Sequence, residues 1–233
     1  MNSTTKIIVG IFLTCFSLGV FAQKKTHTVG VFVTPQVSIL DYKFNMDDVP
    51  DLKLAKANGY GISFSEGVFY QAKYNNLGFS IGLGYTKINN NNNLSFNSGD
   101  STIHSKARVE KSFLSIPIAF FYDFYQKEKF SIGANVGLSI DYLTKSQQLT
   151  DYDDTYFYME THKSTNFISR INLSAFAGID FKWTFANGIG VSVTPTCSYI
   201  FTNTVPLARQ VKENYLVERY VNVGIAGRFF YTF

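Results

Sequence analysis

Residues 130–142, which read FSIGANVGLSIDY, decide the fold. The even-numbered positions of this stretch are bulky and apolar, apart from a single alanine, and the odd-numbered positions that separate them are glycine, serine, asparagine or aspartate. A period of two is the pattern of a β-strand with one apolar face and one small or polar face. Thirteen residues of unbroken alternation exceed the ~5–6 residues of most strands in soluble sheets. They suit a tilted strand that crosses a bilayer, which needs ~9–11 residues.

Seven further segments repeat this alternation. They are residues 29–37, 59–71, 78–87, 114–122, 171–183, 189–201 and 221–233. The total of eight is even, as is required of a single-chain barrel of the bacterial outer membrane. The sequence therefore predicts an all-β chain that forms an eight-stranded antiparallel up-and-down transmembrane β-barrel.

The connections between these segments alternate in length. Short links at residues 73–77, 125–129 and 186–188 separate long polar stretches at residues 38–57, 89–105, 144–164 and 202–214. Outer-membrane barrels have short periplasmic turns and long external loops, so this order predicts that both termini are periplasmic. The five consecutive asparagines at residues 89–93 indicate a flexible external loop.

Composition excludes two other classes of protein. The chain is 45% hydrophobic and 17% aromatic, with 23 Phe and 15 Tyr but only 3 Met. Beyond the first two dozen residues no apolar run approaches the ~20 residues of a membrane helix, which excludes a polytopic helical membrane protein. The net charge of +4 is modest and not clustered, so we expect no nucleic-acid partner.

The N-terminus predicts export. Residues 1–22 carry Lys6, then an apolar stretch, then the small-residue pattern that ends at Ala22, which is typical of a cleaved secretory signal peptide. An uncleaved membrane helix is the alternative, but the apolar part is short. Residues 23–233 then form the barrel domain. Cys197 is its only cysteine, so no intramolecular disulfide can form.

The two faces of the strands predict an apolar exterior and a polar lumen. The residues expected inside, with their charges paired or solvated, are Gly133, Asn135, Gly137, Asp141, Asp180, Lys182, Gly190, Asn222, Gly224 and Arg228. Aromatic residues of the outward face near strand ends are expected to form interfacial girdles. They are Tyr85, Phe120, Tyr122, Phe130, Tyr142, Trp183, Tyr199 and Phe201.

Two features depart from the simple pattern. Glu66 falls on the lipid-facing parity, so we expect either a bulge near Gly67 that redirects it or a strand displaced in depth. Pro35, Pro117 and Pro195 lie inside predicted strands, and because proline cannot donate to the ladder, bulges are expected there as well.

The segment 112–119, SFLSIPIA, resembles the hallmark of the PorT-like family of bacterial outer-membrane β-barrels, a strand reading aromatic-Leu-X-Ile-Pro-Leu before a short turn. Residues 130–137 and 78–85 are similar to neighbouring strands of that family. The resemblance implies an eight-stranded barrel of the OmpA/OmpX type in the envelope of a Gram-negative bacterium. Members are diverse, and the namesake assists protein secretion. The final FFYTF also resembles the C-terminal strand by which the barrel-assembly machinery recognises its substrates.

The sequence offers little chemistry. His27, His104 and His162 lack ligand spacing with a second His or Cys, so we predict no metal site and no cofactor. His104, Ser105 and Glu110 lie close in sequence and suggest an outer-leaflet lipid-modifying enzyme. However, adjacent residues of a strand point to opposite faces, which disfavours contact between the histidine and the serine. No catalytic residue is therefore predicted.

Two polar clusters suggest binding. Lys106, Arg108 and Lys111 are placed where basic residues meet lipopolysaccharide phosphates. An acidic and aromatic cluster at residues 151–160 suits a cation or a protein partner, although a solvated loop is the favoured interpretation.

The leading hypothesis is an integral outer-membrane barrel with a structural, adhesive or secretion-accessory role through its external loops. The alternatives are the lipid-modifying enzyme and a narrow pore. The expected partners are outer-membrane lipids and lipopolysaccharide, the assembly machinery, and an envelope protein.

Overall fold

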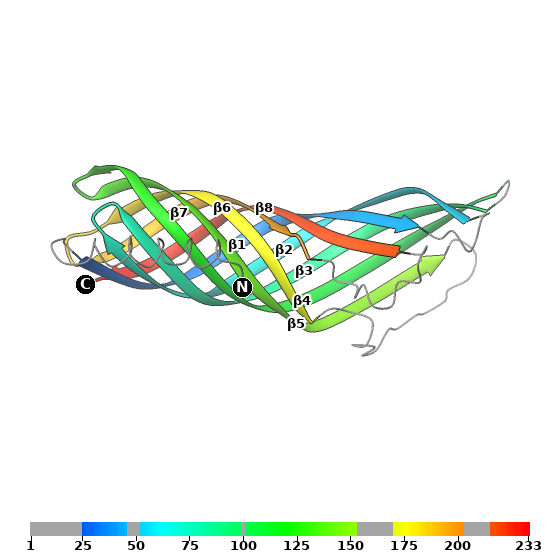
Figure 1. Cartoon of the computed structure of the whole chain (residues 1–233), viewed down its shortest axis with the longest axis horizontal. Coiled ribbons are helices and arrows are strands. Elements are labelled where there is room, and N and C mark those ends of the chain that lie inside the picture. Colours follow the sequence, from blue (N-terminus) through cyan, green and yellow to red (C-terminus); the bar gives the residue numbers. More distant parts are fainter. Residues whose placement is uncertain (1–24, 46–51, 99–100, 153–169, 203–214) are drawn as a thin grey trace, which may run out of the picture.

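The computed structural model describes residues 25–45, 52–98, 101–152, 170–202 and 215–233. Their strands are β1 (Lys25–Asn45), β2 (Leu52–Tyr74), β3 (Leu77–Ser98), β4 (Ser101–Lys127), β5 (Phe130–Tyr152), β6 (Ile171–Thr184), β7 (Ile189–Ile200) and β8 (Tyr215–Thr232). Each strand pairs antiparallel with the next, and β8 pairs with β1, so the sheet closes into a barrel (Figure 1). No helix among the described residues has the length and apolarity to cross a membrane. The predicted fold class is confirmed.

The strands are staggered around the barrel. The ladder partners can be followed once around the barrel, from Val29 on β1 through one residue on each strand and back to β1. They are Val29, Tyr70, Ile81, Ile118, Leu138, Ala175, Tyr199, Val221 and, on β1 again, Ile39. This path returns to β1 ten residues beyond its start. A stagger of this kind accompanies a strand tilt of ~35–45° to the barrel axis. Paired residues on neighbouring strands therefore lie at different heights, and the height rises from β1 towards β8.

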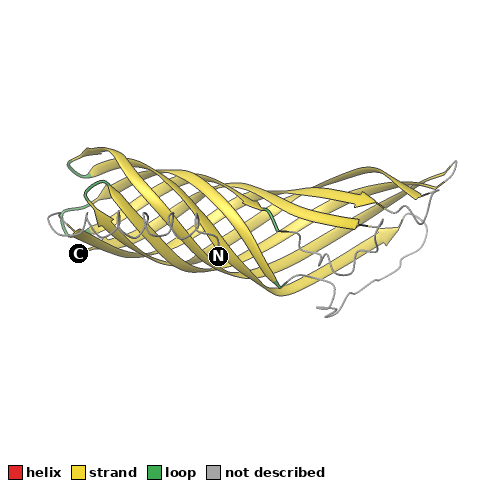
Figure 2. Cartoon of the chain, viewed as in Figure 1, coloured by secondary structure: helices red, strands yellow, loops and turns green. Residues whose placement is uncertain are grey.

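One end of the barrel carries all three short turns and Phe233, and we call it the turn end (Figure 2). The predicted short links are confirmed between β2 and β3, β4 and β5, and β6 and β7. The last of these turns uses Gly188 at φ 81°, where an added Cβ would lie 2.5 Å from the carbonyl oxygen of Thr232. His27 and Phe233 exchange two backbone hydrogen bonds of 2.9 and 2.8 Å, which closes the barrel at this end.

We call the opposite end of the barrel the far end. Several strands extend further there than the others. β4 begins at Ser101, thirteen residues before Leu114, whereas β6 starts at Ile171, level with its partner Tyr142. The prediction of a flexible loop at the asparagine run is wrong, because β3 continues to Ser98. Ladder partners on both β2 and β4 satisfy the backbone of this segment, and such pairing overrides the weak strand propensity of asparagine. The predicted signal peptide and most of the acidic cluster lie outside the described residues.

The prolines do not produce bulges, which corrects a second prediction. At Pro35, Pro117 and Pro195 the ladder with one neighbouring strand lacks two successive residue pairs. The register of that ladder is nevertheless the same before and after each gap. A proline lacks only its own N–H, so the ladder loses a bond without gaining a residue. The register shifts lie elsewhere, at Leu54/Lys56 on β2 and at Ser112/Phe113 and Asp123/Tyr125 on β4.

The exterior is apolar, as predicted. On every strand most outward side chains between the turn end and the far end are apolar and at least partly exposed, and we call this band the apolar belt. All eight aromatic residues assigned to the girdles belong to the outward parity of their strands. On β3 to β5 the last row of the belt at the far end is Tyr85, Leu114 and Tyr142, which are paired side by side.

Glu66 interrupts the belt. It is exposed, and β2 pairs with β3 without a shift from Lys56 to Tyr74, so no bulge near Gly67 redirects it. The belt continues on both sides of it along β2, from Tyr60 to Tyr70, so the strand is not displaced in depth either. The carboxylate therefore points outward within the apolar belt.

Candidate functional site

The ten residues assigned to the lumen all lie on the inward parity of their strands, and the buried ones include Asn135, Asp141, Asp180 and Asn222. The lumen is less uniformly polar than predicted, however. Large apolar side chains also point inward, and they are Phe32, Phe69, Phe113, Phe121, Phe176, Tyr220 and Phe230.

The lumen glycines make room for these aromatic rings. A Cβ added at Gly137 would lie 2.6 Å from the ring of Phe176, and one at Gly190 would lie 2.3 Å from the ring of Phe230. A barrel of eight strands encloses only enough space for side chains. Each of these rings therefore occupies the volume that its glycine neighbour leaves.

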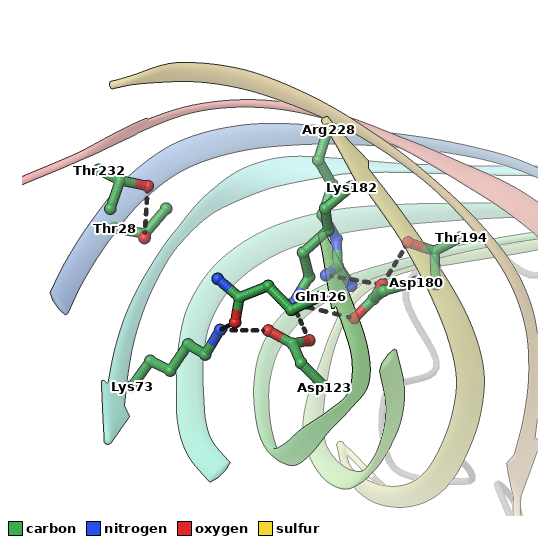
Figure 3. A network of polar contacts seen from close by, with 9 residues as sticks. All are labelled: Thr28, Lys73, Asp123, Gln126, Asp180, Lys182, Thr194, Arg228 and Thr232. Carbon is green, nitrogen blue, oxygen red and sulfur yellow. Dashed lines mark hydrogen bonds and ion pairs between the residues drawn. The ribbon is translucent and has the colours of Figure 1, made fainter. Parts of the chain in front are cut away.

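Charged side chains cross the lumen in the half nearer the turn end (Figure 3). Lys73 Nζ on β2 lies 2.6 Å from Asp123 Oδ2 on β4, and Lys182 Nζ on β6 lies 3.0 Å from Asp123 Oδ1. Lys182 is also 3.9 Å from Asp180, which Arg228 on β8 contacts at 3.3 Å. We call these five residues the lumen strap. Its members lie on β2, β4, β6 and β8, so one chain of alternating charges links every second strand across the lumen.

Other contacts hold the strap in place. The hydroxyl of Thr194 donates a hydrogen bond to Asp180. The Lys182 ammonium lies 4.5 Å from the ring centroid of Phe121, and the Arg228 guanidinium lies 5.5 Å from that of Phe69. Such cation–π contacts stabilise charges that are withdrawn from water. The expectation that the lumen charges are paired is therefore confirmed for Asp180, Lys182 and Arg228.

A cavity of about 170 Å³ occupies the middle of the lumen. Polar side chains line part of it in a row that crosses four strands. Gln36 donates to Ser65 at 3.3 Å, Ser65 and Thr86 are 2.9 Å apart, and Thr86 and Ser115 are 3.4 Å apart. Water suits such a space because several hydroxyl groups line it.

An apolar plug lies beyond this cavity, towards the far end. It consists of the buried side chains Leu40, Ile88, Phe113, Leu143, Ile200 and Tyr220, which contact one another. The lumen is thus occupied at two levels, by the strap near the turn end and by the plug near the far end. This arrangement opposes the passage of solutes.

A second charged group lies on the outside, just beyond the apolar belt at the far end. Lys87 on β3 and Lys145 on β5 both contact Glu110 Oε1 on β4, at 3.0 and 3.2 Å. Arg108 and Lys106 follow Glu110 on the same outward face of β4, and both are exposed. We call these five residues the far-end cluster.

Electrostatics within the far-end cluster favour the ionised carboxylate. The hydrogen bond from Lys87 lowers the pKa of Glu110 below its ordinary value, and the hydrogen bond and positive charge of Lys145 act in the same direction. Partial burial opposes this effect but does not overcome it. Glu110 is therefore negative at neutral pH and holds the two ammonium groups side by side.

The predicted basic group is only partly correct. Lys106 and Arg108 face outward as a lipid-phosphate site requires, but Lys111 is buried in the lumen, with its ammonium 5.2 Å from the ring centroid of Tyr220. Lys111 lies an odd number of positions along β4 from Lys106 and from Arg108. Its side chain therefore points into the barrel, whereas the other two point outward. Lys87 and Lys145 were not anticipated, because only the pairing of β3, β4 and β5 brings them to Glu110.

The structure separates the residues of the enzyme alternative. His104 and Ser105 are consecutive residues of β4. Glu110 lies six residues further along the same strand, a distance of roughly 20 Å at ~3.3 Å per residue. Glu110 is bound by two lysines. These three residues therefore do not form a catalytic triad.

Of the two remaining histidines, one lies within the described ranges. His27 lies at the turn end, where its Nδ1 is 2.7 Å from the hydroxyl of Tyr70 and its ring stacks on that tyrosine and on Phe233. Within the described ranges no three His, Cys, Asp or Glu side chains are grouped closely enough to hold a metal ion. His162 lies outside those ranges.

The chain is similar in fold to solved membrane barrels. Neisserial surface protein A is 12% identical, with a TM-score of 0.40, and the match covers 88% of this chain and 98% of that one. OprG of Pseudomonas aeruginosa is 13% identical, with a TM-score of 0.37 and coverage of 91% and 97%. Ail of Yersinia pestis is 11% identical, with a TM-score of 0.36 and coverage of 89% and 99%. No family model matches the sequence, nor does any curated protein.

Proposed function

We propose that the chain is an integral outer-membrane protein without catalytic activity, closed to solutes, that serves a structural, adhesive or secretion-accessory role. The part that acts on partners is the wall of strands beyond the apolar belt. The proposal includes membership of the PorT-like family and a signal peptide at residues 1–22.

The observation that carries the proposal is the unequal length of the strands. β2, β3, β4 and β5 remain paired well beyond the belt, up to Leu52↔Ser98, Ser98↔Ser101 and Ser105↔Tyr152. On β4 this extension covers thirteen residues past Leu114, or roughly 40 Å of strand. A barrel that only spanned the bilayer would not need such a wall, whereas a protein that presents a surface to other molecules would.

The orientation follows from the connections. We propose that the turn end faces the periplasm, because outer-membrane barrels have their short turns there. Both ends of the described chain would then be periplasmic, and β8, with outward Phe229, Tyr231 and Phe233, would be available to the assembly machinery. The far end would face the cell exterior, where it would meet lipopolysaccharide and an envelope protein.

Location and closure are tested together. Outer-membrane fractionation and heat-modifiable migration should identify a folded barrel in the outer membrane, and a soluble periplasmic protein would refute the proposal. In planar bilayers we expect no stable conductance, because the lumen strap and the apolar plug fill the pore. Steady single channels would instead support the narrow pore.

The role of the wall is tested by photo-crosslinking in the native membrane. A crosslinker at Asn91, exposed on β3 beyond the belt, should capture a protein partner. The matched control is Leu138, an exposed belt residue on β5, where we expect lipid adducts only. Equal protein adducts at both positions, or none at Asn91, would contradict an accessory role for the wall.

The enzyme alternative has its own test. A His104→Ala variant should leave the lipid A composition of the cell unchanged, because Glu110, the acid of the suggested triad, lies six residues away on β4. A change in lipid A confined to this variant would revive the enzyme.

A further inference from the structure

The far-end cluster begins where the apolar belt ends. The last belt row on β3 to β5 is Tyr85, Leu114 and Tyr142, and the ladder row that follows it, at Lys87, Ser112 and Lys145, carries the two accessible lysines on β3 and β5. Lys87 lies two residues beyond Tyr85 on β3, a rise of about 5 Å along a tilted strand, and Lys145 lies three residues beyond Tyr142 on β5, where the register shifts. The two ammonium groups therefore lie at the level of lipid headgroups and on the surface that faces the bilayer.

The cluster has a surplus of positive charge. Its five residues are four cations and the carboxylate Glu110, and the ladder places one further acid, Asp151 on β5, opposite Lys106. Each ammonium carries three donors, so Lys87 and Lys145 keep donors for a ligand while they contact Glu110. Their side chains are 44% and 47% exposed, against 22% for Glu110. The acid thus positions the lysines, and the lysines remain accessible.

The chemistry and the location select the ligand. Phosphate offers several oxygens to several donors at once, which suits two ammonium groups held beside a guanidinium. A group that reaches the outward face at headgroup level comes from the bilayer. The phosphate therefore belongs to a lipid.

We infer that the far-end cluster binds the phosphate groups of a membrane lipid. Lys87 and Lys145 contact the phosphate next to the apolar belt, and Arg108 and Lys106 contact a second anionic group further out. The identity of the leaflet rests on the proposed function: in that orientation the ligand is a phosphorylated glycolipid of the outer leaflet. Glu110 is a positioning residue in this site.

The inference is tested by native mass spectrometry of the purified full chain in detergent, titrated with bisphosphorylated lipid A or with the dephosphorylated lipid. The wild type should bind the phosphorylated form at least about tenfold more tightly. Substitution of Lys87, Lys145 and Arg108 by Gln should weaken that binding by roughly a hundredfold, since each basic residue near an anionic surface contributes about fivefold. Inorganic phosphate alone should bind weakly, because it lacks the acyl chains that seat against the belt.

Matched variants make the result specific. Lys127→Gln with Lys129→Gln removes two exposed cations at the turn end and should leave binding unchanged. Replacement of the three cluster residues by other cations, Lys→Arg and Arg→Lys, should restore most of it, and heat-modifiable migration checks that each variant is folded. The inference is overturned if the triple variant binds like the wild type, if the turn-end control loses as much, or if both lipids bind equally. Failure of the proposed location would appear in cell fractionation and leave this binding result intact.

Discussion

Two sites in this barrel place one carboxylate between two lysines. In the lumen strap, Asp123 lies 2.6 Å from Lys73 and 3.0 Å from Lys182. In the far-end cluster, Glu110 lies 3.0 Å from Lys87 and 3.2 Å from Lys145. The contacts are alike, but the side chain of Asp123 is 2% exposed and that of Glu110 is 22% exposed.

Access to water separates their roles. A buried charge must be compensated by its protein neighbours, because it has lost its hydration. The strap therefore depends on all of its members and closes the lumen. At the surface water replaces any lost partner, so the same arrangement adds little stability and leaves the lysines available to a ligand.

The largest expected effect comes from removing the buried carboxylate. Asp123→Ala would leave Lys73 and Lys182 without their shared partner, and we expect the free energy of unfolding to fall by about 3–5 kcal/mol. Urea unfolding in lipid vesicles, followed by fluorescence of Trp183, measures this change, since Trp183 is the only tryptophan. A loss no larger than that of Glu110→Ala would show that the two sites are equivalent.

A smaller effect is expected when one lysine of each site is made apolar. Lys182→Met leaves Asp123 with Lys73 and Asp180 with Arg228, so a loss of about 2 kcal/mol is expected. The matched variant Lys145→Met should change stability by less than about 0.5 kcal/mol. The same unfolding assay compares the two, and equal losses would contradict the comparison.

Glu66 is a carboxylate in a third setting, exposed on the lipid-facing surface. Glu66→Leu should raise the free energy of unfolding by about 1 kcal/mol, because ionisable groups on the lipid face of a barrel destabilise it. Glu66→Gln serves as the control for charge alone. A loss of stability in native membranes but not in synthetic vesicles would instead indicate that a molecule absent from the vesicles contacts Glu66.

The smallest effect is expected at Glu110. Its pKa is lowered by Lys87 and Lys145, so its contribution to stability is present above the ordinary pKa of about 4.5 and is lost as the pH falls through the lowered value. Glu110→Gln should cost less than about 1 kcal/mol at neutral pH, and less still in high salt. Unfolding curves of wild type and variant should converge in acid, and a constant difference down to pH 3 would rule out this ion-pair contribution.

The strands could be predicted from the sequence, and so could most assignments of side chains to the lumen or to the exterior. Both depend on a period of two that each strand displays by itself. The inward aromatic residues Phe121, Phe176 and Phe230 were missed, although their parity differs from that of the outward rings. Lys111 was misplaced for a similar reason, because it was grouped with Lys106 by proximity in the chain and not by face.

The far-end cluster shows what one sequence could not supply. Lys87, Glu110 and Lys145 belong to three strands, and they meet only through a register set by the whole closed sheet. The asparagine run illustrates the same limit, because its strand conformation comes from pairing with β2 and β4. Neither the meeting of these three side chains nor the strand conformation of the asparagine run can be inferred from local composition.

Closure through β1 and β8 has a consequence for the connectivity of the chain. Because His27 and Phe233 exchange two backbone hydrogen bonds, a short linker could join the two ends, and the turn at Asn75 and Asn76 could be opened instead. Such a circular permutant keeps every strand pair, and permutation is generally tolerated at exposed turns. It would end on β2 in place of β8. We therefore expect it to refold in vesicles yet to be inserted poorly in cells, which would separate the topology that holds the barrel together from the role in assembly that we propose for β8.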